Sequence, residues 1–367
     1  MDKKIKVGIT HGDPNGIGYE VILKTLSNPG IAELCTPVIY GSAKIVGYYR
    51  KGMELPQMQV NTIQNAAQAK EGEANIINVV GEDFKIEPGT PSKTAGEAAF
   101  AALERAVADL RSGDIDVLVT APINKDTIQS DTFHFPGHTE YLESSLGDGN
   151  EALMILANDR IRIALVTTHL PIAKVAEAIT REAVLAKLRI FNRSLMRDFN
   201  IGHPRIAVLS LNPHAGDGGL LGNEEAEIIS PAIEDASKEK ILAFGPYAAD
   251  GFFGTEAYRK FDGVLAMYHD QGLAPFKTIA MDSGVNFTAG LPYVRTSPDH
   301  GTGFDIAGQG VASEESFRQA IYMAIDTFRS RCAFDDARAN PLRRQYFDKG
   351  KDNVVLDLSK DDSAQQA

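Results

Sequence analysis

The sequence of 367 residues predicts an α/β fold built on a largely parallel sheet. Short apolar runs typical of buried strands alternate with amphipathic helical patterns along most of the chain. Such alternation implies parallel strands joined by crossover helices. Several of the apolar runs end in polar residues, and open α/β sheets bind their ligands at the carboxyl ends of their strands. The length is sufficient for two domains, or for one large domain with an internal split.

The expected elements follow from these patterns in chain order. Apolar runs predict strands at 5–10, 37–40, 74–80, 117–120, 163–168, 206–211 and 263–267. Helical spacing predicts helices at 19–26, 43–49, 94–111, 172–199 and 314–328, with further helices beginning near His138 and Asn223. The residues after Leu358 are expected to form a disordered tail.

Composition excludes several classes of partner. The formal net charge of −12 argues against nucleic acid or an anionic membrane as the main partner. The two cysteines, Cys35 and Cys332, are expected to be free thiols in a reducing compartment. The sequence contains no apolar signal segment at its start and no stretch as long as a membrane span. We therefore expect a cytoplasmic protein.

Three predicted strands each lead into one histidine: His169, His214 and His269. A single histidine after a strand is more often a capping or hydrogen-bonding residue than a ligand. The repetition favours a metal, because neutral imidazole is a common ligand of Zn²⁺ and similar ions. Three protein ligands with one open position are typical of a catalytic rather than a structural site. The pattern makes a metal site plausible.

Two other turns carry candidate binding residues. Lys125 follows the strand at 117–120 and suits an anion, a proton transfer or simply solvent. His138 and Thr139 open a helix, a position that suits phosphate or carboxylate, although Thr139 is equally explained as an N-cap. The glycine-rich turn at 11–18 lacks the Rossmann glycine spacing, so a ligand loop and a tight strand-to-helix connection remain open.

Taken together, the motifs resemble those of the 4-hydroxythreonine-4-phosphate dehydrogenase family of pyridoxal phosphate synthesis. The match runs from the first strand to about residue 330. It rests on GDPNGIG, APINK, PGHTEYL, THLP, LNPHAGDGG, YHDQGLAPFK and GLPYVRTSPDHGTGFDIAG. Several of these also look like the wider isocitrate and isopropylmalate dehydrogenase superfamily. Asn15 and Tyr19 depart from the usual first turn, where alanine and proline are commoner.

The resemblance implies two α/β/α domains around a cleft, of the isocitrate/isopropylmalate dehydrogenase type. A discontinuous cofactor-side domain would comprise 1–130 and 290–367, and 131–289 would bind metal and substrate and form the dimer. A homodimer would share each active site between its two chains. A divalent ion, Zn²⁺ before Mg²⁺ or Co²⁺, would be bound by His169, His214 and His269.

The resemblance also implies the roles of the remaining site residues, which we expect on loops that follow strands. Substrate would be bound by His138, Thr139, Lys277, Asn286 and Arg295. NAD or NADP would be bound by the loop that contains His300, Gly301, Gly303, Asp305 and Gly308. Lys125, Asp250 and Asp270 are the candidates for the proton acceptor, and the sequence does not choose among them.

The implied reaction is the oxidation of 4-phosphooxy-threonine, with decarboxylation to 3-amino-2-oxopropyl phosphate. The alternative is a dehydrogenase of the same family that acts on 4-phosphothreonate, 4-phosphoerythronate or another hydroxy acid. A metabolite-binding protein without catalysis is disfavoured, because the three histidines occur together with Lys277 and Arg295.

Overall fold

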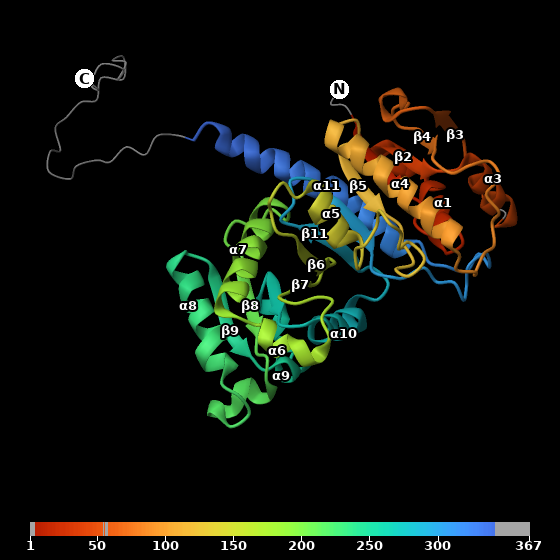
Figure 1. Cartoon of the computed structure of the whole chain (residues 1–367). Coiled ribbons are helices and arrows are strands. Elements are labelled where there is room, and N and C mark those ends of the chain that lie inside the picture. The colour runs from red at the N-terminus through yellow and green to blue at the C-terminus, as the bar shows by residue number, and fades with distance from the viewer. Residues whose placement is uncertain (1–3, 54, 56–57, 342–367) are drawn as a thin grey trace, which may run out of the picture.

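The computed structural model describes residues 4–53, 55 and 58–341, and this part of the chain forms one sheet of twelve strands (Figure 1). Their order across the sheet is β3-β4-β2-β1-β5-β12-β11-β6-β7-β10-β8-β9. The strands are β1 (Ile5–Thr10), β2 (Cys35–Gly41), β3 (Val60–Ile63), β4 (Ala74–Asn78), β5 (Val117–Thr120), β6 (Leu153–Ala157), β7 (Arg162–Leu165), β8 (Arg205–Leu209), β9 (Leu242–Tyr247), β10 (Gly263–Ala266), β11 (Val285–Ala289) and β12 (Arg295–Pro298).

The sheet is parallel on both sides of a mixed centre. β3, β4, β2, β1, β5 and β12 pair in parallel, and so do β7, β10, β8 and β9. Between them, β11 is antiparallel to both β12 and β6, and β6 is antiparallel to β7. The expected α/β class and the predominance of parallel strands are confirmed. The domain boundaries stay a prediction.

Helices cover both faces of this sheet (Figure 1). They are α1 (Gly18–Leu26), α2 (Pro29–Leu34), α3 (Ala43–Gly52), α4 (Lys93–Ser112), α5 (His138–Leu146), α6 (Val175–Ala178), α7 (Arg181–Arg197), α8 (Ser230–Lys238), α9 (Ala249–Gly254), α10 (His269–Ala280) and α11 (Glu315–Ala339). Buried side chains of α1, α3, α7, α8 and α11 belong to one core cluster. Those of α4 and α5 form a second cluster, and those of α9 and α10 a third.

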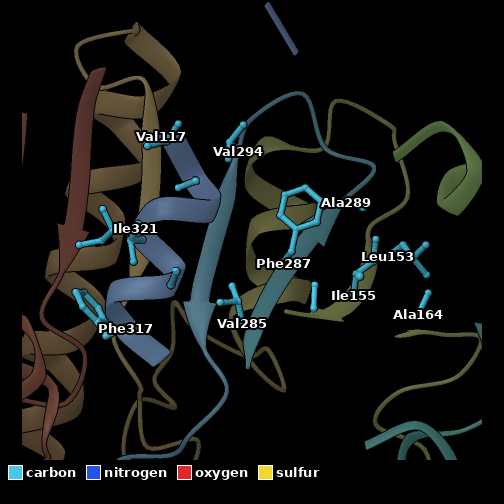
Figure 2. Close-up of a cluster of buried hydrophobic side chains, with 14 of the residues drawn as sticks. Val117, Leu153, Ile155, Ala164, Val285, Phe287, Ala289, Val294, Phe317 and Ile321 are labelled. Carbon is cyan, nitrogen blue, oxygen red and sulfur yellow. The ribbon is translucent and has the colours of Figure 1, made fainter. Parts of the chain in front are cut away.

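The central strands show how side chains divide between the two faces. Figure 2 shows Val285, Phe287 and Ala289 of β11 in the cluster that also contains Phe317 and Ile321 of α11. Successive strand residues point to opposite faces, so Asn286 and Thr288 face away from this cluster. The apolar alternation of β11 therefore buries one side of the strand and leaves the other for the site described below.

Several predicted elements differ from the observed ones. The helix expected at 172–199 is interrupted, because Ile179 is extended and the Thr180 side chain caps a new helix, α7. The last helix is longer than expected and continues to Ala339. The strands β3, β6, β9, β11 and β12 were not predicted. The tail expected after Leu358 lies outside the described residues.

Two smaller expectations can be compared directly with the structure. Cys35 and Cys332 are both free, as expected. Among the described helices, none has the length and apolar character needed to cross a membrane.

The turn at 11–18 is buried and connects β1 tightly to α1. The Asp13 amide donates to the Pro122 carbonyl, and the Ile17 amide donates to the Thr302 carbonyl.

Candidate active site

A cavity of about 290 Å³ contains most of the predicted site residues. Its walls come from the segment after β5, the start of α5, the ends of β7 and β10, and the central strands β11 and β12. The predicted residues that line it are Lys125, His138, Thr139, His169, His269, Lys277, Asn286, Arg295, His300 and Gly301. Segments distant in sequence thus meet at one polar cavity.

Arg295 is a buried cation at the wall of this cavity. Its guanidinium donates to two hydroxyls, those of Thr120 at 2.6 Å and 3.1 Å and of Thr288 at 3.1 Å. Burial lowers the pKa of Arg295 to about 9, and the charge of Glu140 opposes this effect. No carboxylate of the described residues lies within ion-pair distance of it. Since buried charges are normally paired, this arginine is suited to bind an anion that enters the cavity.

Three other polar groups that line this cavity lack hydrogen-bond partners in the part of the chain that the structure describes. His138 Nε2, Asn286 Oδ1 and His300 Nε2 are buried without hydrogen-bond partners among the described residues. Burial, followed by the charges of Arg295 and Lys125, holds the pKa of His138 well below its usual value, so the ring is neutral. Buried polar groups are normally hydrogen-bonded, so this concentration of unpaired groups indicates a ligand site.

Lys277 and His169 have partners at the rim of the same cavity. Lys277 Nζ donates to the Asp299 carbonyl at 3.1 Å and lies 3.6 Å from the Asp299 carboxylate. Burial raises the pKa of Asp299, and Lys277 opposes that rise. His169 Nε2 lies 3.5 Å from Lys125 Nζ.

The rings of His169 and His269 face the same space, with centroids 6.2 Å apart. Nδ1 of each ring is held by a carboxylate: His169 by Glu140 at 2.8 Å and His269 by Asp270 at 2.7 Å. A histidine whose Nδ1–H donates to a carboxylate keeps a lone pair on Nε2, which is the usual arrangement of a metal-binding imidazole. The two residues therefore fit a divalent ion.

His214 does not reach this cavity within the same chain. It lines a second cavity of about 530 Å³ together with Asp250, Tyr268 and Gln271. Within the described residues, no group of three His, Cys, Asp or Glu side chains is close enough to hold a metal. One chain thus brings together two of the three predicted ligands.

The turn that presents His214 has an unusual backbone. Residues 214–218 all have positive φ, including the non-glycine residues His214 (53°), Ala215 (53°) and Asp217 (45°). Glu225 supports the preceding segment, because its carboxylate accepts from the amides of Leu211 and Asn212. Such left-handed residues are individually costly and concentrate at functional sites.

The three candidates for the proton acceptor occupy different environments. Lys125 lines the main cavity, whereas Asp250 lines the second cavity with His214. Asp270 hydrogen-bonds His269, and its side chain is 86% exposed. Of the three, Lys125 is the one that lines the main cavity.

The predicted cofactor loop borders the same cavity through His300 and Gly301. Gly303 and Gly308 have positive φ of 54° and 78°, which favours glycine at both positions. Helix α1 holds the end of the loop, since Lys24 donates to the carbonyls of Gly310 and Ala312. Asp305 is exposed.

The expectation that the anion-binding residues lie on loops after strands was wrong for three of them. Lys277 lies near the end of helix α10, and Asn286 and Arg295 lie within strands β11 and β12. Sequence reasoning also missed Glu140 and Asp299, the two carboxylates of the cavity wall. Both adjoin residues that were identified, Thr139 and His300, and that adjacency was the available signal.

Comparison with known proteins identifies the family. Residues 33–324 match the family described as "Pyridoxal phosphate biosynthetic protein PdxA". The chain belongs to this family. A 4-hydroxythreonine-4-phosphate dehydrogenase of Bacteroides thetaiotaomicron is 58% identical over 357 residues, which cover 97% of this chain and 98% of that protein. The relatives with this name are oxidoreductases, and membership of the PdxA family makes this chain an enzyme of the same kind.

Solved structures agree with this assignment. The 4-hydroxythreonine-4-phosphate dehydrogenase of Klebsiella pneumoniae has a TM-score of 0.76 and 32% identity, covering 89% of this chain and all of that one. A terephthalate 1,2-cis-dihydrodiol dehydrogenase from Burkholderia xenovorans LB400 has a TM-score of 0.58 and 25% identity, covering 88% of this chain and 98% of that one. The PdxA fold therefore also occurs in a dehydrogenase named for a different substrate.

Proposed function

We propose that this PdxA-family enzyme oxidises the secondary alcohol of 4-phosphooxy-threonine with NAD or NADP, with decarboxylation to 3-amino-2-oxopropyl phosphate. The observation that carries the proposal is Arg295, a buried guanidinium with no carboxylate partner among the described residues. A substrate phosphate would supply the missing anion. The name shared by the relatives agrees with this choice of substrate.

Different side chains of the cavity bind different groups of the substrate. Arg295 supplies a charge for the phosphate, and neutral His138 supplies a ring nitrogen as a hydrogen-bond donor. Asn286 Oδ1, which is buried and unpartnered, accepts from the substrate ammonium or hydroxyl. Lys277 lies at the rim beside Asp299, where it suits the substrate carboxylate. These contacts orient the alcohol towards His169 and His269.

The chemistry requires a hydride acceptor, a proton acceptor and a group that stabilises negative charge on oxygen. A nicotinamide cofactor would accept the hydride, and a divalent ion at His169 and His269 would act as a Lewis acid towards the substrate oxygen. The alcohol proton passes to Lys125 Nζ, the candidate acceptor that lines the cavity, and this step requires the uncharged amine form of Lys125. Loss of CO₂ from the carboxylate of the resulting β-keto acid then leaves an enolate, which takes up one proton on carbon to give the ketone.

Substitution of Arg295 tests the substrate assignment. Arg295→Met should lower kcat/KM for 4-phosphooxy-threonine by roughly tenfold to hundredfold, because a charge-assisted hydrogen bond contributes about 1.5–3 kcal/mol. The matched control is Arg162→Met, since Arg162 is also the first residue of a strand but is only partly buried and lines a different cavity. Equal kcat/KM for wild type and Arg295→Met would contradict the phosphate site.

A comparison of kcat/KM values distinguishes 4-phosphooxy-threonine from the alternative substrates. 4-Phosphothreonate and 4-phosphoerythronate keep the phosphate and lack the amine. An enzyme of pyridoxal phosphate synthesis should show a kcat/KM for the amino acid at least tenfold above that for either hydroxy acid. A higher value for a hydroxy acid would assign the chain to that alternative.

We further propose a homodimer in which His214 of the partner subunit completes each metal site. Two features support this: His214 lies apart from His169 and His269 in one chain, and large exposed apolar residues flank the histidines. Ile172 is 72% exposed shortly after His169, and Leu220 is 79% exposed after His214. Exposed apolar residues of this kind are typical of a protein interface.

Mixing inactive variants tests the shared site. A dimer of one His169→Ala chain and one His214→Ala chain would contain one site with all three histidines, so mixing should restore part of the activity. A mixture of His169→Ala with His269→Ala provides the control, since these residues line the same cavity and every mixed site would lack one of them. Recovery in the control, or none in the first mixture after verified exchange, would refute this arrangement.

A further inference from the structure

Glu140 occupies an unusual position between the substrate cavity and a proposed metal ligand. Among the described residues, it is the carboxylate that both lines the main cavity and hydrogen-bonds one of its histidines. Its Oε1 lies 2.8 Å from His169 Nδ1, whereas its Oε2 is buried without a partner. The relatives' names and the reaction proposed above assign it no role.

The hydrogen bond fixes the chemical form of His169. An ionised carboxylate is an acceptor only, so His169 Nδ1 must carry the proton. Nε2 of His169 is then the unprotonated nitrogen, and it lies on the side of Lys125.

The local structure holds Glu140 in place for this contact. It is the third residue of α5, after His138 and Thr139, and the start of a helix favours a negative charge. A glutamate at this position often caps its own helix by accepting from the N-cap amide. Here one oxygen bonds His169 and the other has no partner among the described residues, so capping does not explain the conformation.

We propose that Glu140 is a positioning residue that holds the His169 ring in its Nδ1–H form, with Nε2 directed into the cavity, and thereby sets the affinity of the site for a divalent ion. The proposal rests on the proposed function, in which His169 is a metal ligand. Carboxylates that orient ligating histidines typically change metal affinity by about 10- to 100-fold. Asp270 makes the corresponding contact to His269, but it is far more exposed, so water can replace it more easily.

Co²⁺ is a suitable probe, because its visible absorption reports coordination without any need for turnover. Titration of the full-length protein should give a dissociation constant 10- to 100-fold higher for Glu140→Ala than for wild type. Glu140→Gln keeps an acceptor oxygen and should lose less than tenfold, as should Asp270→Ala. Ser144→Ala, an exposed change on the same helix, should bind as wild type does.

A second measurement separates positioning from a general loss of structure. In metal-free protein with ¹⁵N-labelled histidine, the ring nitrogen shifts of His169 should indicate the Nδ1–H form in wild type and a mixture of tautomers in Glu140→Ala. Glu140→Gln supplies the same comparison should the alanine variant unfold. Co²⁺ binding by both Glu140 variants within twofold of wild type, with His169 unchanged in tautomer, would overturn the inference. Failure of wild type to bind Co²⁺ would instead refute the proposed metal site.

Discussion

Asp13 is a buried carboxylic acid whose protonation should make the stability of the enzyme depend on pH. The side chain has no exposed surface, and while Oδ1 accepts from the Asn15 amide at 2.9 Å, Oδ2 is without a partner among the described residues. Burial raises the pKa of Asp13 from 3.8 to about 6, with the Asn15 amide opposing the rise. The fold therefore binds this proton more tightly than the unfolded chain does.

The direction of the effect follows from linkage. Asp13 deprotonates near pH 3.8 in the unfolded chain but near pH 6 in the folded protein, so stability is lost as the pH rises through this interval. Asp13→Asn removes the titration and keeps an oxygen for the Asn15 amide. Relative to wild type, the variant should gain about 0.4 kcal/mol at pH 3.8, about 1.6 at pH 5 and about 3 at pH 7.

Urea unfolding followed by far-UV circular dichroism at each pH measures this difference. The amide nitrogen that replaces Oδ2 adds an offset that does not vary with pH, so the informative quantity is the change of about 2.5 kcal/mol between pH 3.8 and pH 7. Other titrating groups, including buried His11, are present in both proteins and cancel. Asp131→Asn, an exposed change, serves as the control. A difference between wild type and Asp13→Asn that stays constant with pH would refute the reasoning.

Two further predictions concern contacts of helices α7 and α11. Arg331→Met leaves the buried Asp198 without its ion-pair partner at 2.7 Å, so the free energy of unfolding should fall by about 3–5 kcal/mol, and adding Asp198→Asn should restore part of it. Thr180→Ala removes the side-chain acceptor at the start of α7 and should lower the free energy of unfolding by about 1 kcal/mol, whereas Thr180→Ser should lower it by less than half as much. Urea titration checks both predictions, and full stability of either the Arg331→Met or the Thr180→Ala protein would contradict its explanation.

Strands were predictable where continuous apolar runs are buried on both faces, and β12 shows why others were missed. Its sequence, Arg-Thr-Ser-Pro, has no apolar pattern, yet every residue is buried between β5 and β11. Polar side chains are stable there because other elements supply their partners: Arg295 bonds Thr120, and Thr296 donates to the Ala320 carbonyl of α11. β6, in contrast, is apolar throughout, so its sequence had the pattern of a buried strand although it was not predicted.

Many of the residues that line the main cavity could be predicted from motifs, but their arrangement in space could not. His138, Lys277, Asn286 and Arg295 were identified from motifs, and the structure gathers them around one cavity. Motifs did not reveal that a helix and two strands carry the last three of these residues. The contact between Glu140 and His169 spans 29 positions, so only the folded chain brings the two side chains together.

The turn after β8 has a backbone conformation that bears on the proposed homodimer. A simple connection between a strand and a helix would not require three non-glycine residues with positive φ, each of which costs roughly 1–2 kcal/mol. The support from Glu225 and Asn212 keeps the turn in this conformation, and Gly216 lies so close to Glu225 that a Cβ would come within 2.7 Å of its Oε2. The conformation directs His214 away from His169 and His269 of its own chain and towards a separate cavity. In the homodimer proposed above, this strain would be retained because it keeps His214 out of its own chain's main cavity and available to the partner subunit.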